Sequence, residues 1–278
     1  FFNALKAKMY LRVSNEMYLK RLIVGGFEKV FEFSVDFRNE GLDRFHNPEF
    51  LQMETMWAYA DYKDNVELVE KLFTYIAKKV SGTTKLVYQG QKIDLAPPWS
   101  RLTLVEAVKK YGGIDFSKIK SREEAVEIAR KLKIKVSKDM GMGKILEEVF
   151  DLVVKKHLVQ PTIIYNYPTE TSPLAKPLPD NPDFTERFEV FIAGHEYANS
   201  YSESNDPLFL RESLKKQQEL RKKGDLAAHP IDEEFLEAME YGMPPTSGLG
   251  VGMERLFMLL TDAPSIREVL FFPAMRQK

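Results

Sequence analysis

The sequence contains no cysteine, which excludes a disulfide framework and any metal site built from thiolates, and which fits a reducing cytoplasm. It has no apolar run near the roughly 20 residues that a membrane-spanning helix needs, and its first residues lack the basic and apolar segments of a signal peptide. Neither sign of charge is in excess, because 40 Lys and Arg residues face 41 Asp and Glu residues. A protein that holds nucleic acid through a broad basic surface would be more positive, so we expect any such contact to be local or to lie outside this chain.

What is present is typical of a globular protein with a sizeable core. The chain has 278 residues, of which 44% are hydrophobic and 29% are charged. This length suggests one large domain or two modest ones, and a core of this size needs no disulfide or metal to stabilise it. The N-terminal residues Phe1 and Phe2 are typical of a chain that starts inside a domain, so we expect a fragment of a longer protein.

A strand pair is predicted in the first quarter of the chain. Over residues 30–37 apolar and polar side chains alternate, which indicates a half-buried strand. The apolar members are Phe31, Phe33, Val35 and Phe37. A turn-rich segment follows over residues 41–48, and a second extended run begins near Glu49. Together they predict an antiparallel pair joined by a long loop.

Helix starts are indicated by capping residues that are followed three positions later by a glutamate. The pairs are Asp64 with Glu67, Thr103 with Glu106, and Ser121 with Glu124. Residues 85–95 predict a small hairpin that turns at Gln89 and Gly90, and the stripe from Ile145 to Val154 predicts a further helix. Residues 102–143 are charged and poor in polar clusters that could perform chemistry, so we expect an inserted helical subdomain there.

The second half of the chain mixes strands and helices. Strands are expected at residues 162–165, 188–192 and 196–203, and helices at 209–223, 232–240 and 253–260. The strands alternate polar and apolar residues, which favours an antiparallel sheet with one open face. The predicted fold class is therefore α+β, an antiparallel sheet flanked by helices.

The first group of residues with chemical potential lies on the predicted strand pair. By strand parity Arg38 and Glu40 share one face, and His46, Phe50 and Glu54 share a face on the returning strand. The arginine fork suits a phosphate or carboxylate, and the ring suits a stacked base. A surface hairpin with ordinary ion pairs is the alternative, and spacing alone gives it about equal weight.

A second group is the glycine-rich run from Gly248 to Gly252, followed by Glu254 and Arg255. Glycines before a helix allow close backbone approach, and the helix N-terminus favours an anion. The run lacks the Lys-Ser/Thr pair of a phosphate-binding P-loop. A tight strand-to-helix turn is therefore the alternative interpretation.

Two further groups lie on the later strands. Glu189 and Glu196 form a carboxylate pair that could hold magnesium beside substrate phosphates, although solvated sheet-edge carboxylates are the alternative. Asn199, Tyr201 and Glu203 share a strand face with a period of two. Glu196 has the wrong parity to join them, so we expect a β-bulge between Glu196 and Asn199.

These groups together resemble a known family. Arg38-x-Glu40 with the loop to His46 and Phe50 resembles motif 2 of class II aminoacyl-tRNA synthetases, and the run from Gly248 to Arg255 resembles motif 3. The lysyl-tRNA synthetases are specifically indicated by six runs, at residues 11–21, 38–41, 46–50, 58–62, 172–175 and 241–246. The resemblance covers nearly all of residues 1–278 and implies a class II catalytic domain with a small helical insertion.

The resemblance implies an ATP site. Arg38 would contact the amino-acid carboxylate and the α-phosphate, and Glu40 would accept from the adenine amino group. Phe50 would stack on one side of adenine, Arg255 would flank the other near the γ-phosphate, and His46 would reach the outer phosphates. Arg38 and Arg255 would be the catalytic residues, with no covalent enzyme intermediate.

Further residues complete the implied ATP and metal sites. Asn47, Gly252 and Glu189 would join the ATP-binding set. Glu189 and Glu196 would carry Mg²⁺ that bridges the phosphates.

The resemblance also implies a lysine site. Glu16 and Glu203 match the carboxylates at the lysine side chain, and Glu54 matches the carboxylate near the α-amino group. Asn199 would hold the α-carboxylate, and Tyr201 would line the same site. A carboxylate pair that faces an uncharged side chain is costly, so discrimination for lysine would be large.

One position departs from the family pattern. The family usually has a tyrosine two residues after the glutamate that matches Glu54, whereas this chain has Met56. A methionine cannot donate and accepts only weakly. Either lysine binds more weakly here, or Trp57, Tyr201 or a water substitutes, and we expect the Met56 side chain itself to pack.

The family's anticodon-binding domain and motif 1 are not in this sequence, so we expect the full-length protein to contain them and to form a homodimer. The implied function is ATP-dependent activation of lysine and its transfer to tRNA(Lys). One alternative is a ligase that modifies a protein lysine, as in the elongation factor P-modifying paralogues, whose motif 3 tends to have alanine where this chain has Gly250. The other alternative is a non-catalytic paralogue, which would usually have lost Arg38, Glu40 or Arg255.

Overall fold

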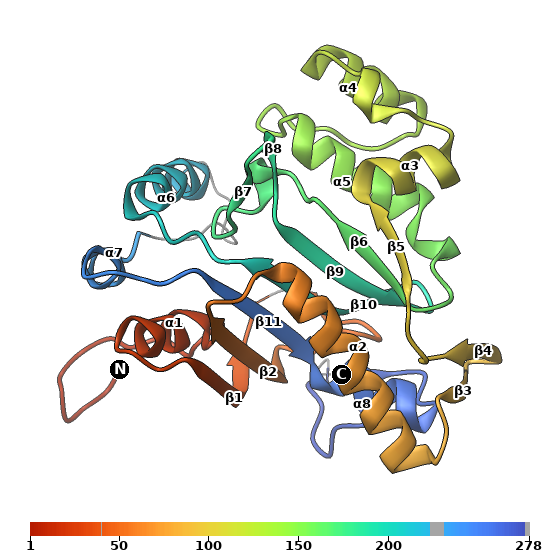
Figure 1. The fold of residues 1–278 in the computed structure, drawn as a ribbon, viewed down its shortest axis with the longest axis horizontal. Coiled ribbons are helices and arrows are strands. Elements are labelled where there is room, and N and C mark those ends of the chain that lie inside the picture. The colour runs from red at the N-terminus through yellow and green to blue at the C-terminus, as the bar shows by residue number, and fades with distance from the viewer. Residues whose placement is uncertain (40, 223–230, 276–278) are drawn as a thin grey trace.

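The computed structural model describes residues 1–39, 41–222 and 231–275. Within these residues, seven strands form one sheet: β1 (Lys29–Phe37), β2 (Glu49–Ala58), β5 (Ser100–Thr103), β6 (Thr162–Tyr165), β9 (Arg187–Ile192), β10 (His195–Ser202) and β11 (Thr246–Gly252). Their order is β1-β2-β11-β10-β9-β6-β5 (Figure 1). Every neighbouring pair is antiparallel except β5 with β6. The predicted antiparallel sheet of an α+β fold is confirmed.

Two small hairpins and a set of helices surround this sheet. The hairpins are β3 (Lys85–Tyr88) with β4 (Gln91–Asp94), and β7 (Pro177–Leu178) with β8 (Asn181–Thr185). The helices are α1 (Glu16–Val24), α2 (Tyr62–Ser81), α3 (Leu104–Gly112), α4 (Arg122–Lys131), α5 (Met142–Val153), α6 (Pro207–Lys222), α7 (Glu233–Glu240) and α8 (Met253–Thr261). In the described part of the chain, no helix combines the length and the apolar character needed to span a bilayer.

The two faces of the sheet differ in what covers them. Helices α2 and α8 bury apolar residues such as Phe73 and Leu256 against Val190 and Val251 of the sheet. Helix α2 crosses the strands as a long diagonal element (Figure 1). The opposite face is covered by α1 near β2, where Leu19 packs in a small separate cluster, and by α5 near β6 and β9, where Phe150 packs on Phe191. Between them lie polar residues of β9 and β10 and the glycines of β11.

The helix starts agree with the capping signals except at α2. The sequence predicted a start at Asp64, but the cap is Asp61, whose side chain accepts from the Asp64 backbone while Asp64 accepts in return from the Asp61 N–H. An aspartate therefore replaces the glutamate of the usual capping box. The reciprocal pair of Thr103 and Glu106 is confirmed at α3. Ser121 caps α4 as predicted.

Strand β1 forms where predicted, but its apolar side faces outward. Phe31, Phe33 and Val35 are 67%, 52% and 45% exposed, whereas Ser34 and Asp36 are buried. The expectation of a conventional half-buried strand is wrong in its orientation. β1 lies at the edge of the sheet, and the N-terminal segment covers its polar side, with the Phe37 N–H donating to the Arg12 carbonyl at 2.8 Å.

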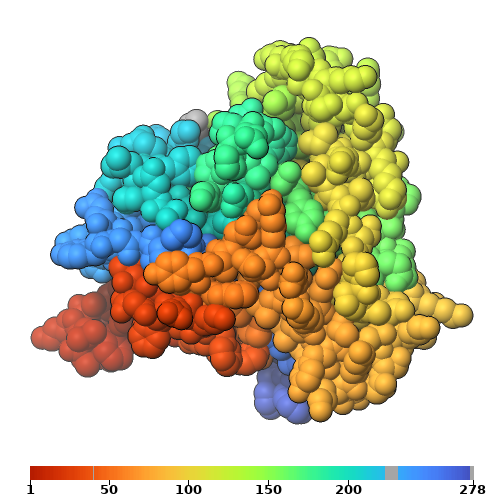
Figure 2. Space-filling model, viewed as in Figure 1, coloured from red at the N-terminus to blue at the C-terminus, as the bar shows by residue number. Residues whose placement is uncertain are grey.

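Helices α3, α4 and α5 pack around a second hydrophobic cluster beyond β6 and β5. Ile145 and Val149 of the predicted stripe are buried in it, together with Phe191 of the sheet. Figure 2 shows this part of the chain, coloured yellow to green, rising as a lobe above the rest. Leu102 and Thr103 belong to strand β5 of the main sheet, so the helical part begins after them.

Candidate active site

Four residues of neighbouring strands lie directly opposite one another and form a row across the sheet. Glu54 on β2 pairs with Gly250 on β11, Gly250 pairs with Asn199 on β10, and Asn199 pairs with Glu189 on β9. Residues directly opposite each other in antiparallel strands point to the same face. The row therefore crosses four strands with one glycine between three polar side chains, on the face opposite α2.

The glycines of β11 let carboxylates of neighbouring strands lie against its backbone. A Cβ atom on Gly250 would lie 2.9 Å from Glu54 Oε2, and a Cβ atom on Gly248 would overlap Glu203 Oε1. The sequence predicted this run as the entry to a helix, but Gly248 and Gly250 lie inside a central strand. Gly252 alone marks the start of α8, where it has no side-chain cap.

The bulge expected in β10 is confirmed. The pairing with β9 shifts between Glu196 and Ala198, so Tyr197 and Ala198 both enter the core. Glu196 thereby moves to the open face that Asn199 occupies. The extra residue supplies the parity change that a regular strand would not allow.

At one end of the face the structure brings Arg255, Glu196 and His46 together. The Arg255 guanidinium donates to the Glu196 carbonyl at 2.7 Å and lies 3.1 Å from His46 Nε2. The other ring nitrogen of His46 lies 2.8 Å from Asp43 Oδ2. This arrangement joins the β1–β2 loop to the first turn of α8 through one arginine.

Arg38 lies beside this loop. Its guanidinium donates to the Val13 carbonyl at 3.1 Å and to Gln52 Oε1 at 3.3 Å, and it stacks 5.0 Å from the centre of the Phe50 ring. Glu40 lies outside the described residues. The prediction from strand parity that Arg38 and Phe50 share a face is therefore confirmed. Arg38 contacts both Phe50 and Gln52, which lie two positions apart on the same face of β2.

Asn47 is not turned toward this group. Its amide donates to the Glu49 carbonyl at 2.6 Å, and its side-chain oxygen accepts from the Ala274 N–H at 3.0 Å. Both polar atoms thus hold backbone in place. Its expected part in ATP binding stays a prediction.

Glu189 and Glu196 are two carboxylates whose negative charges interact. Burial and then the negative charge of Glu196 raise the pKa of Glu189 to about 7, against the opposing effect of Arg187. Such a pair attracts a cation, because a positive charge would relieve the repulsion. Among the residues that the structure describes, no set of three or more His, Asp or Glu side chains is placed to hold a metal.

Arg187 is a site residue that was not predicted from the sequence. Its Nε donates to Asn199 Oδ1 at 3.0 Å, and its Nη2 donates to Glu189 Oε1 at 2.6 Å. Because the arginine occupies the amide oxygen of Asn199, the amide N–H groups are left to face other partners. The signal was available: Arg187 is two residues before Glu189 and therefore shares its strand face.

At the other end of the face lies a group of buried carboxylates. We call Glu16, Glu54 and Glu203 the carboxylate cluster: beyond the effect of burial, the charge of Glu16 raises the pKa of Glu54 and of Glu203, and the charge of Glu54 raises the pKa of Glu203. The Tyr201 hydroxyl donates to Glu16 Oε1 at 2.7 Å. Burial raises the pKa of Glu203 well above its usual range, with a further contribution from Glu16.

Lys20 of α1 is a second site residue that was not predicted from the sequence. Its ammonium pairs with Glu16 at 2.5 Å and with Glu203, and its side chain is 3% exposed. Burial tends to lower its pKa, but Glu16 and Glu203 raise it by more, so the net shift is upward. The spacing of four residues from Glu16 indicated an ion pair on a helix, but gave no sign that the pair is buried.

Met56 packs, as expected. It is 1% exposed and lies with Leu19, Ile23 and Ala58 between α1 and β2. It stands one register position from Glu54 on the same face, close to Gly248. The Tyr201 hydroxyl contacts Glu16, and Tyr201 is one of the substitutes predicted for the missing tyrosine.

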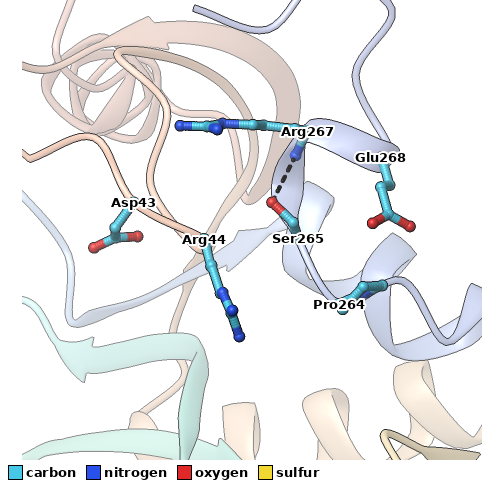
Figure 3. A pocket seen from close by; sticks show the side chains of 6 residues that line it. All are labelled: Asp43, Arg44, Pro264, Ser265, Arg267 and Glu268. Atoms are coloured by element: carbon cyan, nitrogen blue, oxygen red, sulfur yellow. Dashed lines mark hydrogen bonds between the residues drawn. The ribbon is translucent and has the colours of Figure 1, made fainter. Parts of the chain in front are cut away.

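A hollow of about 460 Å³ lies beside the β1–β2 loop, away from this face. It is lined by Asp43, Arg44, Pro264, Ser265, Arg267 and Glu268 (Figure 3). The Ile266 N–H donates to the Arg44 carbonyl at 2.8 Å, which fastens the loop to the segment after α8. The hollow therefore marks the outer side of the loop that carries His46, and not the acidic face.

The fold and this face together define the core of a class II aminoacyl-tRNA synthetase: an antiparallel sheet with an arginine-bearing hairpin and a glycine strand that leads into an arginine-bearing helix. Residues 2–276 match the model of the tRNA synthetases class II (D, K and N), and the chain belongs to this family.

Curated relatives narrow the similarity to one branch of that family. The chain is 54% identical over 276 residues to the lysine–tRNA ligase of Thermoanaerobacter pseudethanolicus, covering 99% of this chain and 55% of the relative. It is 51% identical over 276 residues to those of Moorella thermoacetica and Staphylococcus haemolyticus, covering 99% of this chain and 56% of each relative. The chain thus spans about half the length of these relatives.

Proposed function

We propose that the protein activates L-lysine with ATP to form lysyl-adenylate and transfers the lysyl group to tRNA(Lys), in the cytoplasm. The observation that carries the proposal is the carboxylate cluster at one end of a face whose other end holds Arg38 and Arg255. Buried negative charge suits the two ammonium groups of lysine, and arginines suit phosphates. The similarity to lysine–tRNA ligases over 99% of the chain supports the same conclusion.

In this proposal the chemistry is carried by positioning and charge. The lysine carboxylate attacks the α-phosphorus of ATP, a new acyl–phosphate bond forms, and pyrophosphate leaves. Arg38 would neutralise the charge that develops at the α-phosphate. Glu40, Phe50, Gly252 and Arg255 would hold the nucleotide, and His46 would contact its outer phosphates.

Lysine would be held from both ends. Glu16 and Glu203 would receive the side-chain ammonium, and Tyr201 would orient Glu16 by its hydrogen bond. Glu54 would receive the α-ammonium, and Asn199, fixed by Arg187, would turn its amide N–H groups to the α-carboxylate. An uncharged amino acid would leave the buried carboxylates without a partner, which disfavours it.

We further propose that Glu189 and Glu196 hold Mg²⁺. The two carboxylates lie on paired strands, and burial together with the negative charge of Glu196 raises the pKa of Glu189, so the pair of carboxylate donors fits a hard divalent cation. The metal would neutralise phosphate charge in the bound nucleotide. With two protein ligands, the remaining coordination positions would be filled by phosphate oxygens and water.

Lysine-dependent exchange of pyrophosphate into ATP tests the proposed activity. The intact protein is expected to catalyse exchange with L-lysine and not with L-aspartate or L-asparagine, because those side chains bring no cation to the carboxylate cluster. Absence of exchange with every amino acid would contradict the enzymatic function. Transfer of the product to an elongation factor in preference to tRNA would select the protein-modifying ligase instead.

We also propose that the full-length protein is a homodimer that uses the outer face of β1. Phe31, Phe33 and Val35 form a row of exposed apolar side chains on an edge strand, which a soluble monomer would rarely leave uncovered. Covering this row with a second copy would remove both the apolar surface and the free edge from water.

Phe33→Asp is expected to convert the dimer to a monomer, because an unpaired carboxylate would become buried in the contact. Sedimentation velocity measures the mass, and Val87→Asp, at an exposed position of the β3 hairpin, is the matched control. A dimer that persists in the Phe33→Asp protein would contradict the assignment of this face.

We propose that residues 102–143, of which Leu102 and Thr103 form the end of β5, behave as an inserted helical subdomain of the catalytic domain. Helices α3 and α4 bury their apolar sides in the second hydrophobic cluster, where Ala125 and Ala129 are fully buried. This separate cluster is what supports the proposal.

A further inference from the structure

We propose that Lys20 is an internal competitor for the lysine substrate: its ammonium occupies the place of the substrate's side-chain ammonium and must give up Glu203 when lysine binds. The inference rests on the proposed function and adds a residue that sets the affinity for lysine. It starts from the position of Lys20 on α1, with its ammonium against both Glu16 and Glu203.

The contacts of Lys20 are those expected of a bound lysine side chain. Its ammonium pairs with two carboxylates and lies 5.6 Å from the centre of the Tyr201 ring. The same ring carries the hydroxyl that orients Glu16. A charged group is held by two counter-charges and an aromatic face, which is how proteins bind ammonium ligands in general.

The site around Lys20 is closed. The side chain of Glu203 is fully buried and that of Glu16 is 15% exposed. Lys20 pairs with Glu203 through Oε2, and a second ammonium on the same fully buried carboxylate would lie beside the first, where the repulsion between two positive charges is large. An incoming lysine therefore has to exchange with Lys20 at one carboxylate at least.

Lys20 also has a function in the ligand-free protein. Three buried carboxylates without a cation would be strongly unfavourable, and Lys20 supplies one positive charge to them. A neutral side chain brings no charge to replace Lys20 at Glu203. Only a ligand with its own ammonium can complete the exchange without leaving a buried charge unpaired, so the competitor also favours lysine over uncharged amino acids.

Lys20→Met tests the competition. Methionine has a similar length without the charge, so the intact variant is expected to bind L-lysine about tenfold more tightly than the unaltered protein, as the loss of one competing charged contact implies. Isothermal titration calorimetry at pH 8 measures the affinities for lysine and for ATP, and the affinity for ATP should not change. Lys71→Met, at a surface ion pair whose lysine side chain is 74% exposed, is the control and should leave both affinities unchanged.

The possible results separate the two proposals. Lysine affinity that is unchanged or weaker in Lys20→Met, in a protein that catalyses lysine-dependent exchange, would overturn the competition and leave the proposed function standing. Absence of lysine binding in both proteins would overturn both.

A second measurement does not depend on the variant folding. In a crystal structure of the unaltered protein with lysine, the ligand's side-chain ammonium should pair with Glu203 and Lys20 Nζ should have withdrawn from it. Lys20 Nζ that remains within about 4 Å of both Glu16 and Glu203, the usual ion-pair limit, would overturn the inference.

Discussion

Arg38→Ala is expected to lower the rate of lysyl-adenylate formation by about 10²- to 10³-fold, the loss typical of removing one preorganised donor to a developing negative charge. The guanidinium is held in place before any substrate arrives, because it donates to the Val13 carbonyl and to Gln52 and stacks on Phe50. Gln52 in turn donates to Glu54, so Arg38 is linked to the carboxylate cluster through one side chain. Pyrophosphate exchange at saturating lysine and ATP measures the effect.

The fold should survive this change. The contacts of Arg38 lie near the surface, so removing them is not expected to disturb the packed clusters, and the thermal unfolding midpoint should move by a few degrees at most. Arg130→Ala, at a surface ion pair on α4 whose arginine is 72% exposed, should leave exchange unchanged. Exchange within about threefold of the unaltered protein in Arg38→Ala would show that another group neutralises the transition-state charge.

Arg38→Lys sharpens the same prediction. Lysine retains the charge but lacks the planar fork that contacts a main-chain carbonyl and a side-chain oxygen at once. We expect it to recover little of the lost rate. Recovery to the level of the unaltered protein would mean that charge alone is needed at this position.

Strand parity was sufficient to predict which polar residues share a face within each strand, but not how the strands pair to form the acidic face. Glu54, Asn199 and Glu189 each lie on a strand that the alternation of side chains identified, and the glycines of β11 mark where the backbone must stay bare. The bulge beside Glu196 was predictable for the same reason, because Glu196 and Asn199 differ in parity and chemistry favours a shared face. Local rules work here because each strand has one buried and one open side.

Parity failed at β1 because that strand is at the edge of the sheet. The alternation of apolar and polar residues predicts which residues share a side of the strand, but not which side is covered by the rest of the protein. The N-terminal segment covers the polar side, where Asp36 is buried and hydrogen-bonded to Ser34 at 3.0 Å. An apolar row left on the outside is therefore a feature of the tertiary arrangement and not an error of the strand assignment.

Lys20 could not be found by local rules either. Its partner Glu203 lies in the last third of the sequence, and the contact depends on how α1 packs against β2. A lysine on an exposed helix face is the ordinary expectation for that residue type. The burial of Leu19 and Ile23 beside Met56 carries Lys20 into the carboxylate cluster.

Lysine binding is expected to strengthen as the pH rises from 6 to 8, through Glu54. Burial and then the charge of Glu16 raise the pKa of Glu54 to about 8, so the ligand-free protein holds a proton there at lower pH. The α-ammonium of lysine favours the ionised carboxylate, so binding below pH 8 releases that proton. For one group with this pKa, the dissociation constant should fall by at most about fiftyfold between pH 6 and pH 8.

Calorimetry in buffers of different ionisation enthalpy measures both the affinity and the number of protons released. Glu54→Gln should abolish most of the pH dependence, because the amide does not titrate, and should release fewer protons at pH 7. Glu67→Gln, whose carboxylate is 70% exposed on α2, should behave like the unaltered protein. A pH profile that stays equally steep in Glu54→Gln would move the titrating group to another carboxylate, such as Glu203, whose pKa is also raised by burial.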